Sequence, residues 1–195
     1  MIQELSFKIA KWLEQEGAIS GKDNRLFSYA VYSLLFGLLP IFIVVILGLA
    51  FGMLREGLLM ITPFMLIRKF SGGYHLDSPK LCVIISIVLL TLAMVLLKVV
   101  AQERYMSFLT VMVSLSVICL CIFSPVENSA RMLTDTERRL FRKTACVLAA
   151  VSMLVYLVLC ETIYVQCAAA FGVGILLVAC LQFPCKIKSI LCNIY

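Results

Sequence analysis

Long apolar runs separated by short charged segments are the feature that most limits how this chain folds. They recur from Tyr29 to Phe183, and 63% of the 195 residues are hydrophobic, against roughly half in soluble domains. Strand-length alternation is absent, and a backbone in lipid satisfies its own hydrogen bonds most simply as a helix. We therefore predict an all-α fold. It is a polytopic membrane helical bundle of about six transmembrane helices, forming a single domain over residues 1–195.

The segment 1–28 precedes the first predicted span and is amphipathic. Its apolar side chains share one helical face: Ile2, Leu5, Ile9, Trp12 and Leu13. We expect a helix that lies in the membrane interface and contacts lipid, the alternative being an ordinary surface helix packed on the loops. No cleavable signal is visible, because acids accompany the lysines here.

The apolar runs also predict where the spans begin and end. The run 29–67 is too long for one span, so we place a turn between Gly48 and Gly57 and expect the second span to be short and partly buried. The remaining predicted spans are 81–101, 105–123, 144–160 and 162–183, followed by a short tail at 184–195.

Positive charge orients these spans. Only three basic residues fall on one side: Arg55, Lys98 and Arg104. The others lie in the N-terminal segment, in the loops 68–80 and 124–143, and in the tail. We therefore expect both termini and both loops to be cytoplasmic. This topology and contact with anionic lipids explain the net charge of +6, so we expect no nucleic-acid partner.

The loop 68–80 carries the chemistry that the chain offers. It holds the only histidine, His75, and Cys82 follows seven positions later. Ser78-Pro79 is a helix-start signal, which puts Cys82 in or just after the first turn, where the helix dipole favours a thiolate. One continuous helix over 75–82 would hold the two side chains about 10.5 Å apart. The interruption instead lets His75 approach Cys82 as a general base, and we predict this pair as a catalytic dyad.

Neighbouring residues supply candidate supporting groups. Those expected to bind an oxyanion or to orient the dyad are Gly72, Gly73, Ser71 and Asp77. Arg68 and Lys69 suit a substrate carboxylate. Each also has a purely structural interpretation: a turn, a helix cap, packing or a topology signal. With one histidine and no CxxC pair, neither a metal site nor another cofactor is expected.

The run from Arg68 to His75, followed by Cys82, resembles the signature of the accessory gene regulator B (AgrB) family. The match covers the basic pair, Ser-Gly-Gly-x-His and the step from histidine to cysteine. Ser124-Pro125-Val126-Glu127-Asn128 and the charged segment to Lys143 resemble the family's second cytoplasmic loop. Many relatives continue there with Lys-Pro, whereas this chain has Ser129-Ala130.

The resemblance implies a bacterial cell-membrane cysteine endopeptidase of peptide quorum sensing, acting as a homodimer. Its substrate would be an amphipathic pro-peptide. From their charge, Arg138 and Arg139, together with Arg142 and Lys143, are candidates to hold its acidic tail, although topology alone would explain the same charges. Cys82 would cut off that tail through an acyl-thioester, and the retained part would close into a thiolactone or lactone. The alternative is a non-enzymatic small transporter or peptide-export component, although its usual mid-span ionisable residue is missing. A thiol-redox enzyme is disfavoured because CxxC is absent.

Overall fold

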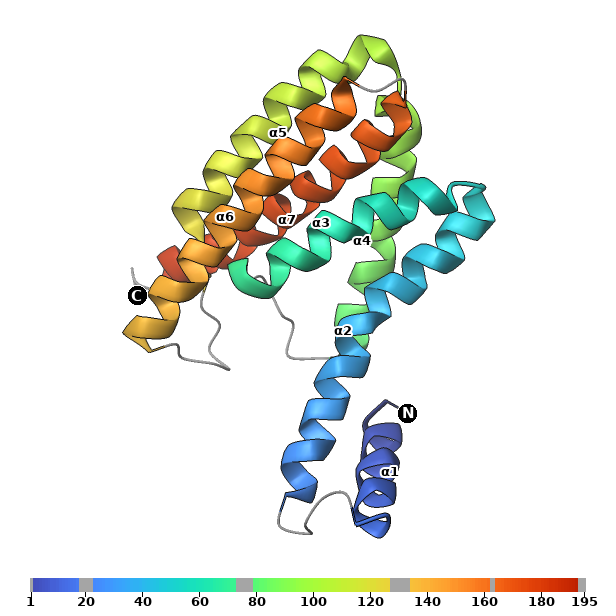
Figure 1. The fold of residues 1–195 in the computed structure, drawn as a ribbon, viewed down its shortest axis with the longest axis vertical. Coiled ribbons are helices and arrows are strands. Elements are labelled where there is room, and N and C mark those ends of the chain that lie inside the picture. Colours follow the sequence, from blue (N-terminus) through green and yellow to red (C-terminus); the bar gives the residue numbers. More distant parts are fainter. Residues whose placement is uncertain (1, 18–22, 73–78, 127–133, 162–163, 193–195) are drawn as a thin grey trace. The chain divides into compact units, whose positions relative to one another are not determined.

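The computed structural model describes residues 2–17, 23–72, 79–126, 134–161 and 164–192, and these ranges are helical with no strand. Figure 1 shows their helices in chain order. They are α1 (Ile2–Gln15), α2 (Asn24–Phe51), α3 (Leu54–Ser71), α4 (Pro79–Val100), α5 (Glu103–Phe123), α6 (Asp135–Cys160) and α7 (Val165–Cys192). The predicted all-α class is confirmed.

Five of the described helices are long and apolar enough to cross a membrane, namely α2, α4, α5, α6 and α7. Large apolar side chains cover their outward surfaces, as Leu92, Val111 and Leu154 illustrate, each more than half exposed. Such a surface is unfavourable in water and suits lipid acyl chains. The chain is therefore a polytopic helical membrane bundle, as predicted.

The remaining long helix, α3, occupies the place of the short second span expected within the run 29–67, and it is not among the five helices that are long and apolar enough to cross a membrane. The chain turns at Gly52-Met53, inside the predicted interval. Charged residues occupy both ends of α3, so its apolar middle is shorter than a lipid-facing span requires. The helix instead buries one face against α7 and α6.

The chain forms two compact units, residues 1–43 and 44–195. The first contains α1 and the beginning of α2. In α1, Leu5 and Trp12 are exposed, whereas Ser6 and Ala10 are buried. The Asn24 side-chain amide donates a hydrogen bond to the carboxylate of Glu14 and so links the two helices. An amphipathic N-terminal helix is confirmed, and its place in the membrane interface stays a prediction.

The second unit is built around α7, which packs against α3, α5 and α6, with further contacts from α4 (Figure 1). Small residues make the closest of these contacts possible. A Cβ added to Gly174 would lie 2.1 Å from the Met60 carbonyl oxygen and 2.8 Å from Pro63 Cγ. The backbones of α3 and α7 therefore touch, a packing mode that small residues allow in membrane bundles.

Two helix boundaries differ from the sequence prediction. Helix α6 begins at Asp135 rather than Thr144, because Thr134 and Glu137 form a capping box that starts the helix within the charged loop. Helix α7 continues to Cys192, where a tail was expected from Pro184. Proline removes one backbone donor, but its fixed φ is compatible with a helix. The second loop is thus shorter, and the last helix longer, than predicted.

Candidate functional site

The structure describes only the two ends of the loop 68–80, which we call the polar loop: residues 68–72 and residues 79–80. Gly73, His75 and Asp77 lie outside the described residues, so the pairing of His75 with Cys82 stays a prediction. Helix α4 begins at Pro79, which confirms the expected helix start and places Cys82 in the first turn. Its thiol is free and partly buried. Backbone N–H groups of a first helical turn have no partner within the helix, and they favour a negative charge nearby.

The other end of the loop contacts the second loop. Ser71 closes α3 and is fully buried. Its carbonyl accepts a hydrogen bond of 2.9 Å from the Val126 N–H, and Gly72 forms a parallel β-bridge with Val126. The two stretches that carry the family resemblance are therefore held together by backbone hydrogen bonding.

Gly72 ends α3 in a conformation reserved for glycine. Its φ is 74° and its ψ is −166°, a combination that side chains exclude. A Cβ here would lie 2.3 Å from the Val126 carbonyl oxygen. The Gly72 N–H already donates to the Arg68 carbonyl at 3.2 Å. This donor therefore caps α3, and other N–H groups would have to donate hydrogen bonds to an oxyanion.

A glutamine that the sequence analysis did not single out joins the same place. Gln182 of α7 is 2% exposed. Its Nε2 donates to Ser124 Oγ at 2.9 Å and to the Ser71 carbonyl at 3.3 Å. The available signal was a lone amide in the apolar run 179–183. We refer to Ser71, Gly72, Ser124, Val126 and Gln182 as the loop junction.

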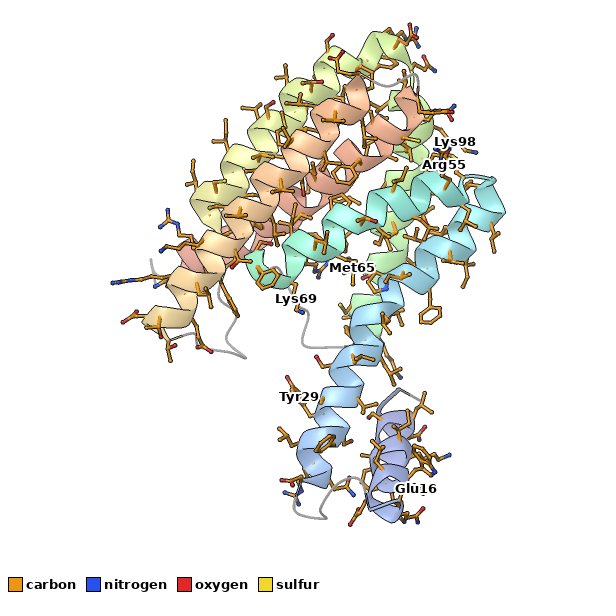
Figure 2. All side chains as sticks on the ribbon, viewed as in Figure 1. Glu16, Tyr29, Arg55, Met65, Lys69 and Lys98 are labelled. Carbon is orange, nitrogen blue, oxygen red and sulfur yellow. The ribbon has the colours of Figure 1, made fainter. Side chains whose placement is uncertain are left out.

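Basic side chains predicted to bind substrate lie near the loop junction, at the end of α3 and the start of α6: Arg68, Lys69, Arg138 and Arg139. The two helix ends touch, because the rings of Phe70 and Phe141 meet edge to face with centroids 5.9 Å apart. Figure 2 shows Lys69 at this end of α3 and Arg55 at the opposite end. Arg138 and Arg139 are exposed. The structure thus brings both basic pairs to neighbouring helix ends.

A polar hollow of about 390 Å³ lies at the opposite end of α3. Its lining comes from the start of α3, the α4–α5 turn and the start of α7, and includes Cys167. That thiol is almost fully buried. None of the described residues that line the hollow is a histidine. Among the described side chains, no cluster of three potential ligands is placed to hold a metal ion.

The AgrB family model, described as accessory gene regulator B, matches residues 6–183. Two curated relatives, both from Clostridium perfringens, are similar over 89 residues. A putative AgrB-like protein 2 of strain 13 is 32% identical and a putative AgrB-like protein of strain SM101 is 30% identical, over 46% of this chain and 42% of each relative. The aligned part thus spans less than half the length of these relatives. No solved structure matches the chain significantly. Because the family model covers nearly the whole chain, including both ends of the polar loop and the loop junction, the chain belongs to the accessory gene regulator B family.

Proposed function

We propose that this protein is a membrane-embedded cysteine endopeptidase that processes the pro-peptide of a quorum-sensing signal. The observation that carries the proposal is the position of Cys82. It is a free, partly buried thiol in the first turn of α4, directly after the loop that contains the only histidine. A thiolate is the reactive form of cysteine, and a helix start together with a nearby imidazole favours it. Family membership supports the same chemistry.

The first half of the reaction transfers the N-terminal part of the pro-peptide to the enzyme. His75 takes the thiol proton of Cys82, and the thiolate attacks the scissile carbonyl carbon. The resulting oxyanion is stabilised by N–H groups at the start of α4 and by Gly73, since the Gly72 N–H is engaged within α3. When the intermediate collapses, the carbon–nitrogen bond breaks and His75 returns the proton to the leaving amine. The C-terminal tail departs and a thioester remains on Cys82.

The second half closes the ring. His75 takes the proton of a cysteine or serine side chain within the retained peptide, and that side chain attacks the thioester carbonyl. The Cys82 thiolate leaves and receives the proton back from His75. The product is a thiolactone or a lactone, and the enzyme is restored without a cofactor. Intramolecular attack is favoured over hydrolysis when the acyl group is held close to its own nucleophile and water is limited. A site at the inner membrane surface provides both conditions.

Substrate binding follows from the charges around the site. An amphipathic pro-peptide would lie on the inner leaflet and approach the loops already concentrated on the membrane. Arg68 and Lys69 would contact a carboxylate near the scissile bond, and Arg138 and Arg139 would hold the acidic tail. Asp77 would orient His75, and Ser71 would fix the beginning of the loop. We further propose cytoplasmic termini and a homodimer.

The decisive test compares Cys82→Ala and His75→Ala with the unmodified protein in phosphatidylglycerol vesicles. The probe is an amphipathic peptide with a central cysteine and an acidic C-terminal tail. The unmodified protein should release the tail and show a mass-spectrometric adduct at Cys82. Both variants should lose tail release by several orders of magnitude, because each removes one member of the dyad. Cys119→Ala, which removes a thiol from the membrane-spanning part of α5, serves as the matched control and should retain activity.

Tail release by Cys82→Ala at the unmodified rate would disprove the proposed nucleophile. Release that depends on Cys82 and is insensitive to His75→Ala would leave a cysteine peptidase with a different base. If the protein neither cuts the probe nor accumulates an adduct, while moving the intact peptide across the vesicle membrane, the export alternative would replace the peptidase.

A further inference from the structure

Gln182 is a buried amide at the end of the membrane-spanning part of α7, flanked in sequence by apolar residues. It is 2% exposed. Burying an amide is unfavourable unless its polar atoms are hydrogen-bonded. The partners of this one are not on α7: they are the Ser71 carbonyl at the end of α3 and the Ser124 hydroxyl after α5.

The orientation of the amide is fixed by chemistry. A carbonyl oxygen accepts hydrogen bonds and never donates them, so the NH₂ group of Gln182 must face Ser71. Its Oε1 is then buried without a partner among the described residues. An apolar side chain of similar length would remove this unpaired oxygen, but it would also remove the donor to the buried Ser124 hydroxyl. What Gln182 contributes specifically is therefore the two bonds that it donates.

These bonds reinforce a contact that is already close. The Ser71 carbonyl receives a second hydrogen bond from the Val126 N–H, and Gly72 approaches Val126 so tightly that no Cβ fits between them. One amide thus connects the beginnings of both loops to the end of the membrane-spanning part of α7. Along the sequence, the loop junction lies directly before the segment that contains His75.

We propose that Gln182 is a positioning residue for the peptidase reaction. It anchors the point from which the loop 68–80 leaves α3 to the start of the second loop, and it thereby positions His75 for its predicted pairing with Cys82. This inference rests on the proposed peptidase function. It assigns a role in that function to α7, a helix that contributes no residue to the predicted dyad.

The test uses Gln182→Met in the full-length protein in vesicles. Methionine keeps the length and bulk and removes both donors. The matched control is Gln166→Met, at the other end of the same helix and exposed. Ser124→Ala removes only one of the two acceptors and should have a smaller effect. Three measurements are made: tail release from the cysteine-containing probe peptide, the pH midpoint for alkylation of Cys82 by iodoacetamide, and amide hydrogen exchange across 68–82 and 124–134.

We expect Gln182→Met to slow tail release roughly tenfold or more, as misplacement of a catalytic group does, with kcat lowered and KM little changed. The alkylation midpoint should move toward that of His75→Ala, and exchange should accelerate in both segments together. Gln166→Met should match the unmodified protein in all three measurements. Thermal unfolding of Gln182→Met should stay close to that of the unmodified protein, which separates positioning from loss of fold.

Faster exchange with unchanged kcat and an unchanged alkylation midpoint would overturn the proposal, because Gln182 would then be purely structural. Unchanged exchange in both segments would overturn it as well, since the anchoring itself would be absent. Failure of the peptidase proposal is seen separately, as a lack of Cys82-dependent tail release by the unmodified protein. In that case the positioning role fails with it.

Discussion

At the scale of single residues, Gly72, the described member of the Gly-Gly pair, has a structural role. The sequence indicated only that glycine permits unusual backbone conformations. In the structure, Gly72 is required twice over: by its positive φ and by the lack of space beside Val126. Its N–H is used to end α3. In the proposed reaction, the oxyanion would therefore be stabilised by Gly73 and by the start of α4, which stays a prediction.

Gly72→Ala should destabilise the protein and reduce tail release strongly. Alanine adds the strain of a positive φ, about 1–3 kcal/mol, and also places a Cβ against the Val126 carbonyl oxygen. Gly52→Ala is a matched control, since Gly52 has a similar φ of 67° but nothing within 4 Å of an added Cβ. Thermal unfolding in detergent measures the stability of both variants. Equal losses for the two variants would show that the contact with Val126 contributes nothing.

At the scale of helices, one local signal located a helix start and another was missed. Ser78-Pro79 correctly located the start of α4. The capping box Thr134–Glu137 starts α6 inside the charged run, so the predicted start at Thr144 was wrong. Gln182 was not predictable in this way. Its partners come from α3 and from the segment after α5, so its role depends on tertiary packing that no local pattern contains. The same holds for the contact between Gly174 and Met60.

Gly174→Ala should destabilise the bundle by about 1–3 kcal/mol, the usual range for overpacking a tight core. The added methyl group would meet the backbone of Met60, which cannot move without shifting α3. Gly37→Ala, where an added Cβ has nothing within 4 Å, should be neutral or slightly stabilising, because alanine favours helices over glycine. Unfolding by sodium dodecyl sulfate in mixed micelles compares the two. A Gly174→Ala variant as stable as Gly37→Ala would contradict the close α3–α7 contact.

At the scale of the second unit, helix ends and turns lie together at two opposite ends of α3. At one end is the loop junction, where the end of α3, the segment after α5 and residue 182 of α7 are in contact. The polar hollow gathers the start of α3, the α4–α5 turn and the start of α7 at the other. Lys98 lies over the ring of Phe51 and Arg55 over that of Tyr164, both near that second end. These contacts place the ends of both charged loops at one end of this unit and the α4–α5 turn at the other, while the topology in the membrane stays a prediction from charge.

Labelling of single introduced cysteines should fix that orientation, with a membrane-impermeant maleimide applied to intact cells. Gln102→Cys lies in the α4–α5 turn and should react from outside, since the positive-inside rule places the sparsely charged end there. Lys69→Cys and Arg139→Cys should react only after the membrane is permeabilised. The two substitutions test both loops, because a shared end of the bundle requires them to behave alike. If Lys69→Cys were labelled in intact cells and Gln102→Cys were protected, the topology would be the inverse of the predicted one. It would also place the proposed site where a pro-peptide made in the cytoplasm cannot reach it without export.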